Sequence, residues 1–217
     1  MRLKTVAYSI LVGVMSLAFV PVASAQDGAY VRVDGGFQHR ARAAENAQTY
    51  TDWDNGFAID AAVGYETKSR VSFEGEYSYL KNNDKTTASA VTGPAPGLGN
   101  VSLDFFMGNV RYDAPVAPSV DVYVSGGLGG YKSYLHGISN TIAHSFGIDA
   151  NGSNDGVVLA WQVRAGLEAR VTPHVGVLVG YRYLHGNDLL FKGTAFGDLM
   201  PNGVKINAVE AGVRIKM

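Results

Sequence analysis

The 217-residue chain contains no cysteine. Without thiols the protein cannot form disulfides, a thiolate metal site or a cysteine nucleophile. Charged residues make up only 17 % of the chain and the net charge is −1, so the basic excess typical of nucleic-acid-binding proteins is missing. A disordered tail is excluded as well, because hydrophobic residues reach 47 %. We therefore expect a folded protein with no nucleic-acid partner.

Long apolar runs are also scarce, and the one that is present lies at the N-terminus. Arg2 and Lys4 precede an apolar stretch over residues 6–22, and Ala23-Ser24-Ala25 fits the cleavage site of a secretory signal. A membrane-anchoring helix is the alternative, but no basic flank follows the run. No later stretch reaches the roughly 18 apolar residues that a spanning helix needs. We predict a cleaved signal peptide over 1–25 and one exported domain over 26–217.

Apolar and polar residues alternate with period two through the rest of the chain, which is the pattern of β-strands with two different faces. Val177 and Tyr181 fall on an apolar face, for example, and Arg182 on the opposite one. An eighth strand, 101–112, puts Phe105 and Met107 on its polar face, and we predict a β-bulge near Phe106 that would correct this. The seven clean segments are 31–38, 57–66, 71–79, 120–128, 161–171, 175–183 and 208–217.

Long and short connections alternate between these strands. Eight strands joined in this order form an antiparallel meander with four long loops at one end and three short turns at the other. The short turns are 67–69, 114–119 and 172–174, and the long polar stretches, rich in loop-forming residues, are 39–55, 81–100, 136–156 and 185–203.

A soluble sandwich turns its apolar faces inward, whereas a membrane barrel turns them outward. The apolar faces span five or six alternating positions, which suits the roughly 9–11 residues that a strand needs to cross a bilayer. Because lipid cannot satisfy backbone groups, strands in it must close into a barrel. We predict an all-β, eight-stranded, antiparallel up-and-down transmembrane β-barrel, with a secreted soluble β-sandwich as the alternative. Two aromatic belts favour the barrel: Tyr30, Tyr65 and Tyr112 near the short turns, and Phe37, Phe57, Tyr79, Tyr131, Trp161 and Tyr183 near the long loops.

The polar faces would fill the barrel interior, which eight strands make just wide enough for side chains. Buried charges are tolerated only when they are paired, so we expect interlocked ion pairs instead of a water path. Glycines on the same faces would make room for arginine and tyrosine side chains: Gly64, Gly127, Gly166, Gly180 and Gly212. The charges are Arg32, Asp34, Asp60, Glu66, Glu74, Glu76, Arg111, Asp121, Arg164, Glu168, Arg170, Arg182, Glu210, Arg214 and Lys216.

Several segments resemble one known family. Gly180-Tyr181-Arg182-Tyr183 and the last nine residues, 209–217, resemble the final hairpin of OmpA/OmpX-like outer-membrane β-barrels. Residues 29–36 resemble the opening strand of the surface-antigen branch common in alphaproteobacteria, and 109–113 and 126–129 fit its fourth and fifth strands. The family usually ends in an aromatic residue, whereas this chain ends in Met217.

The resemblance implies a non-enzymatic integral outer-membrane protein for envelope structure or surface interaction. Both termini and the three short turns would be periplasmic, and the four long loops extracellular. The implied partners are outer-membrane lipid and lipopolysaccharide, the barrel-assembly machinery during biogenesis, and an extracellular ligand of the loops that the sequence does not identify.

Some outer-membrane barrels of this size modify lipid A with a histidine, a serine and a carboxylate near the outer rim, so a lipid A-modifying enzyme is the alternative function. The candidates here are His136, Ser139, His144, Ser145 and Asp149. They fall in one predicted loop, where spacing fixes no hydrogen-bond geometry. We expect no catalytic residue and no cofactor.

Two further motifs could bind a ligand or could be ordinary surface segments without a binding role. Residues 149–156 resemble the front half of a calcium loop, but Asn154 and Ala160 stand where such a loop has glycine and glutamate. Asn, Asp and Ser also suit ordinary turns, so we expect no metal site. The basic cluster His39-Arg40-Ala41-Arg42 either contacts lipopolysaccharide phosphates or forms a solvated rim.

Overall fold

The computed structural model of the protein describes residues 28–40, 43–46, 49–53, 55–89, 93–96, 100–138, 150–153, 156–187 and 203–217. Side-chain burial is described over 28–40, 55–82, 100–134, 156–187 and 203–217. The predicted signal peptide, 1–25, lies outside these ranges. Within them, no helix combines the length and the apolar character needed to cross a membrane.

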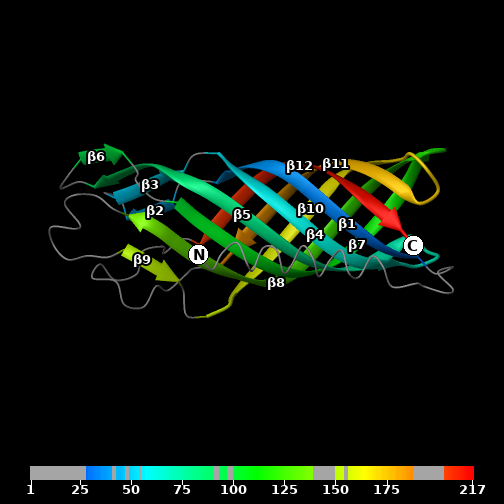
Figure 1. The fold of residues 1–217 in the computed structure, drawn as a ribbon, viewed down its shortest axis with the longest axis horizontal. Helices are drawn as coiled ribbons and strands as arrows, with labels where there is room; N and C mark the ends of the chain where they lie inside the picture. Colours follow the sequence, from blue (N-terminus) through cyan, green and yellow to red (C-terminus); the bar gives the residue numbers. More distant parts are fainter. Residues whose placement is uncertain are drawn as a thin grey trace.

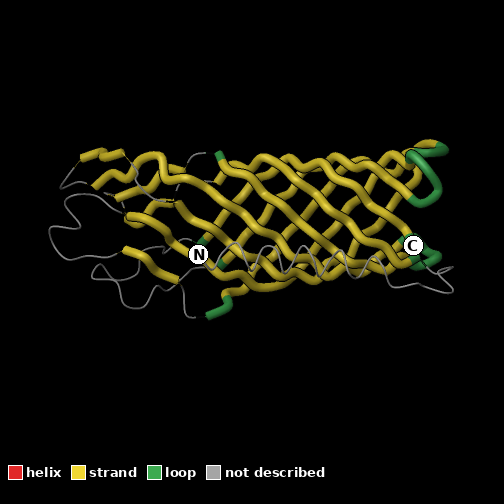
Figure 2. Tube along the Cα trace, in the orientation of Figure 1, coloured by secondary structure: helices red, strands yellow, loops and turns green. Residues whose placement is uncertain are grey.

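Eight antiparallel strands pair into a closed barrel. Figures 1 and 2 show its elongated shape. Each strand pairs with its neighbours in chain order, and the ring closes where the first pairs with the last, from Tyr30 opposite Lys216 to Arg40 opposite Ile206. The predicted fold is confirmed. The strands are β1 (Ala29–Arg40), β4 (Gly56–Glu66), β5 (Val71–Ser89), β7 (Asn100–Ala117), β8 (Val120–Ile138), β10 (Val158–Arg170), β11 (Val175–Gly186) and β12 (Val204–Lys216).

The two ends of the barrel differ in the way that the alternation of connections predicts. Short connections, 67–70, 118–119 and 171–174, join strands at one end, which we call the short-turn end. At the opposite, long-loop end, β5 and β8 continue beyond the barrel wall and four short strands pair near them (left in Figure 1). These are β2 (Ala43–Asn46), β3 (Thr49–Trp53), β6 (Gly93–Pro96) and β9 (Ala150–Ser153).

Three of the four stretches predicted as loops, 39–55, 81–100 and 136–156, therefore contain additional strands, and the fourth, 185–203, begins with the last two residues of β11. Thr86 and Thr87 on β5, for example, pair with β3 on one side and with β6 on the other. Strands can pair through backbone hydrogen bonds without having an apolar face, so a search for alternating hydrophobic residues does not detect these strands.

Strand β7 corrects a second expectation. Its pairing with β5 runs without a register shift from Asn100 to Tyr112, so the predicted bulge near Phe106 is wrong. Phe106 faces outward and is 59 % exposed, whereas Phe105 and Met107 point into the lumen and are buried. The register needs no correction because the lumen at this height is itself apolar, as described below.

The outer surface is apolar along the barrel wall. On β11, Val177 is 46 % exposed and its neighbour Leu178 is 2 % exposed, which confirms the predicted orientation of this strand. Seven of the nine predicted belt aromatics point outward, but Tyr30 and Tyr131 lie buried in the lumen. Both fall on the inward face of an unbroken alternation, Tyr30 beside Arg32 and Tyr131 beside Ser133, so their place near a strand end was misleading.

Candidate functional site

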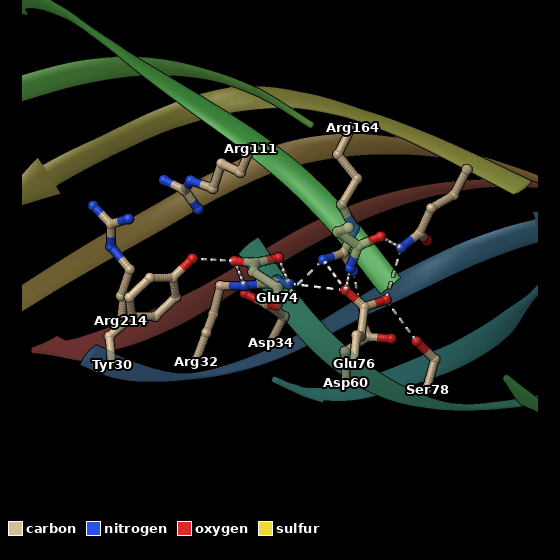
Figure 3. Close-up of polar contacts among 12 residues, drawn as sticks. Tyr30, Arg32, Asp34, Asp60, Glu74, Glu76, Ser78, Arg111, Arg164 and Arg214 are labelled. Atoms are coloured by element: carbon tan, nitrogen blue, oxygen red, sulfur yellow. Dashed lines mark hydrogen bonds and ion pairs between the residues drawn. The ribbon is translucent and has the colours of Figure 1, made fainter. Parts of the chain in front are cut away.

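The interior of the barrel holds most of the charged side chains of the strands. Twelve of the fifteen charges predicted to face inward are buried, and Glu66, Arg170 and Lys216 lie partly exposed at the short-turn rim. Apart from Asp121, which pairs with Arg70 and Arg170 near the short-turn rim, these buried charges form two groups. The central cluster, shown in part in Figure 3, comprises Arg32, Arg164 and Arg182 with Asp34, Asp60, Glu74, Glu76 and Glu210. The turn-end cluster comprises Arg111 and Arg214 with Asp113 and Glu168.

Glu76, on β5, connects the arginines of the central cluster, which come from different strands. Its Oε2 accepts hydrogen bonds from Arg32 Nη2 at 2.9 Å and from Arg164 Nη1 at 2.9 Å. Its Oε1 lies 3.5 Å from Arg182 Nη1 and also accepts from the amide of Gln162 at 3.0 Å. One carboxylate therefore contacts guanidinium groups from β1, β10 and β11, across the full width of the lumen.

The other carboxylates add further ion pairs to these arginines. Arg182 Nη1 lies 2.9 Å from Asp60 Oδ1, and its Nη2 lies 2.7 Å from Glu210 Oε1. Arg164 Nη2 contacts the same Glu210 at 3.0 Å. Arg32 pairs with Asp34 and, at 3.0 Å, with Glu74. Such multiple, charge-assisted contacts are what makes buried charge tolerable.

The turn-end cluster repeats this arrangement closer to the short turns. Arg111 Nη2 contacts Asp113 at 2.6 Å and Glu168 at 2.5 Å, while Arg214 contacts the same two carboxylates at 3.1 and 2.9 Å. Asp113 was missing from the predicted set, although it continues the inward alternation of Asn109 and Arg111 past the end of the predicted strand.

Tyrosine rings separate the charged groups and use space left by glycine. Tyr30 donates to Glu74 at 2.8 Å, and the Arg214 guanidinium lies 5.0 Å above the Tyr30 ring. A Cβ added at Gly64 would lie 2.5 Å from the Tyr30 ring. One added at Gly166 would lie 2.7 Å from the hydroxyl of Tyr123. This confirms that these inward glycines make room for tyrosines.

An apolar layer covers the central cluster on the side of the long loops. Phe105 and Tyr131 stack there with ring centroids 4.9 Å apart. The prediction of an ion-paired lumen is therefore right from the short-turn end to the middle of the barrel, but it is wrong near the long-loop end. The buried residues of the layer are Ala58, Leu80, Val101, Leu103, Phe105, Met107, Tyr131, Ala160, Leu184, Val204 and Ile206.

The structure also corrects the prediction made for the basic cluster at the end of β1. Arg40 is buried in the lumen at 2 % exposure, so it neither contacts lipopolysaccharide nor forms a solvated rim. It continues the inward series of Asp34 and Gln38, because β1 does not end at residue 38. His39 is exposed, with Nδ1 3.0 Å from Asn55 Oδ1, and Ala41 and Arg42 lie outside the described residues.

Most of the residues considered for catalysis or calcium lie outside the described part of the chain. The backbone of His136 lies on β8, but its side chain and the residues Ser139, His144, Ser145 and Asp149 lie outside the described part of the chain. The same holds for 154–155 of the calcium-like stretch. Over the ranges that are described, no group of three or more His, Asp or Glu residues is placed to hold a metal ion.

A closed eight-stranded wall with an apolar exterior, outward aromatics and an ion-paired interior defines a transmembrane β-barrel. The sequence pattern of the outer membrane protein beta-barrel domain matches residues 9–215, and the chain belongs to this family of outer-membrane proteins. No curated protein matches the chain.

Solved structures show the same fold. Neisserial surface protein A, from Neisseria, is 18 % identical with a TM-score of 0.63, covering 88 % of this chain and 97 % of its own. OprG, an outer membrane protein of Pseudomonas aeruginosa, is 13 % identical with a TM-score of 0.59 and covers the same shares of the two chains. At these identities the likeness concerns the fold alone.

The position of Glu76 yields a stability prediction. We expect Glu76→Gln to lower the free energy of unfolding by about 3–5 kcal/mol, because it removes the charge that three buried guanidinium groups share. The measurement is urea unfolding of the protein folded into lipid vesicles. Far smaller losses would show that the remaining carboxylates compensate.

Glu66→Gln is the matched control, since it makes the same chemical change at the partly exposed short-turn rim. The Glu66 side chain contacts Lys216 at 2.6 Å, and the Lys216 side chain is 29 % exposed. The Glu66 side chain is 15 % exposed and also lies 3.7 Å from the buried Arg214, so we expect a loss of about 1–2 kcal/mol, between that of an exposed and a buried pair. Equal losses in both variants would contradict the central role of Glu76.

Proposed function

We propose that the protein is a non-enzymatic integral outer-membrane protein that serves envelope structure or surface interaction, with a lumen closed to water. The observation that carries this proposal is the stacking of two ion-pair clusters beneath an apolar layer inside the barrel. Side chains fill an eight-stranded barrel, and paired charges in this geometry hold strands together instead of lining a path.

In this proposal the long-loop end faces the outside of the cell and both termini face the periplasm. The first and last strands begin and end together at the short-turn end, where Met217 N donates to Ala29 O at 2.9 Å. Short periplasmic turns and longer extracellular loops are typical of outer-membrane barrels. The partners would be outer-membrane lipid and lipopolysaccharide, the barrel-assembly machinery during biogenesis, and an extracellular ligand bound through the long loops.

A closed lumen predicts the absence of steady conductance. Purified, folded protein in planar lipid bilayers should give no porin-sized current, because its interior is occupied by buried side chains. Steady, large conductance steps would refute the closed lumen.

A non-enzymatic role predicts unchanged lipid A. Mass spectrometry of lipid A from cells with and without the protein should give the same acyl-chain pattern. A difference that disappears with His136→Ala or His144→Ala would establish the lipid A-modifying enzyme instead.

The orientation can be tested with single cysteines, because the chain has none of its own. Asn187 is exposed at the long-loop end and Ser69 is exposed in the first short turn. A membrane-impermeant maleimide should label Asn187→Cys on intact cells and Ser69→Cys only after the outer membrane is permeabilised. The opposite labelling would reverse the proposed topology.

A further inference from the structure

The outer wall of the barrel contains a groove between β4, β5 and β7. Its volume is about 520 Å³, within the range of small-molecule sites. Gly75 lies at its base, where an added Cβ would have no neighbour within 4 Å. Ala61, Val63, Tyr77 and Phe106 also line it, and the Tyr77 and Phe106 ring centroids are 5.1 Å apart. The groove is therefore apolar, walled by aromatic rings, and open toward the lipid.

A polar patch lies on the same wall, next to the groove on its long-loop side. Asp104, on β7, is two residues beyond Phe106 and accepts a hydrogen bond from the Tyr77 hydroxyl at 2.8 Å. Lys132 of β8 is the direct cross-strand partner of Asp104, and Tyr79 of β5 is its partner on the other side. Lys81 lies two residues beyond Tyr79. The patch thus combines two cations with one carboxylate and phenolic hydroxyls.

Exposed cations lie near both ends of the barrel, and at the short-turn rim Arg70 and Arg170 pair with Asp121 and Lys216 pairs with Glu66. The outward-facing lysines of the described barrel strands, Lys81, Lys132 and Lys205, all lie near the long-loop end. Outward charge within the lipid is costly but becomes tolerable near the interface. Cations at one interface complement a leaflet whose lipids carry phosphate groups.

We propose that the wall formed by β4, β5, β7 and β8 binds one lipid A molecule of the outer leaflet. One acyl chain occupies the groove over Gly75, beside Tyr77 and Phe106. Lys132 and Lys81 bind the phosphate groups, and Asp104 accepts hydrogen bonds from the sugar hydroxyls. The proposal rests on the proposed orientation, in which the long-loop end lies in the outer leaflet.

The combination of features selects lipid A among membrane components. A phospholipid such as phosphatidylglycerol also carries hydroxyls, but it has a single phosphate and would therefore engage only one of the two lysines. A second copy of the chain would cover the groove but would bring lysines against lysines at the long-loop end. Lipid A supplies phosphate, hydroxyl and acyl groups in one molecule.

Native mass spectrometry of the full, detergent-folded protein tests this proposal, with purified lipid A as the added probe. We expect one bound lipid A in the wild type. Gly75→Leu, which fills the groove, and Lys132→Gln, which removes a cation, should each lower the apparent affinity about five- to tenfold.

Two control variants make the same changes elsewhere on the outer face. Gly35→Leu fills an outward glycine position on β1, outside the proposed wall, with no neighbour closer than 3.9 Å, and Lys205→Gln removes a lysine from β12, on the opposite side of the barrel. Both should bind lipid A like the wild type. A shift between unboiled and boiled samples on a denaturing gel checks that all four variants are folded.

Each other outcome overturns the proposal. Equal binding by all variants would show that lipid A binds without this site. Equal binding of phosphatidylglycerol and lipid A would identify a general anionic-lipid groove, and a dimer lost only in Gly75→Leu would identify a second copy as the occupant. Because binding by purified protein does not depend on topology, conductance or lipid A chemistry in cells, these results are distinguishable from a failure of the proposed function.

Discussion

Every backbone N–H and C=O group of a strand in lipid needs a partner, because the bilayer core supplies none. In this protein that constraint is met by pairing β1 with β12, which leaves no free edge in the eight-stranded wall. Closure of the barrel then determines the environment of the side chains on each face of a strand. One face of each strand must suit lipid, and the other must fill a narrow interior in which most charged side chains are buried away from bulk water.

The interior is filled in two different ways along its length. Toward the short turns and at mid-height, arginines and carboxylates from distant strands neutralise one another, with Glu76 touching three guanidinium groups. Toward the long loops, aliphatic and aromatic side chains such as Leu103 and Phe105 pack instead. The ionic part supplies specific, directional contacts, and the apolar part separates it from the loops.

The sequence alone predicts the wall well, because its signal is a strict period of two. The orientations of Val177, Leu178 and Arg182 follow directly from that alternation. It fails where the two faces have similar polarity. Phe105 and Met107 indicate a bulge only because hydropathy cannot distinguish an apolar lumen layer from a lipid-facing stretch, and the position of Tyr131 near a strand end does not show that its ring points into the lumen.

The alternation of apolar and polar residues also does not predict where the strands end. Arg40 and Asp113 lie one or two residues past the predicted strands, so their inward direction depends on pairing that continues beyond the apolar face. The partners within the lumen could not be predicted either. Alternation places Glu76 and Arg164 on inward faces, but which charges meet depends on the stagger between strands, which no local pattern contains.

The connectivity of the central cluster has a consequence for how the chain assembles. Its members on the first three barrel strands are one arginine and four carboxylates, whereas those on the last three are two arginines and one carboxylate. Arg182 and Asp60, which meet at 2.9 Å, are separated by 122 residues. Neither half can therefore neutralise its own charge, and an N-terminal half that entered lipid alone would carry several uncompensated anions. Insertion and closure should accordingly proceed as one cooperative event, slow because its decisive contacts are remote in the chain, and driven partly by the attraction of two oppositely charged halves.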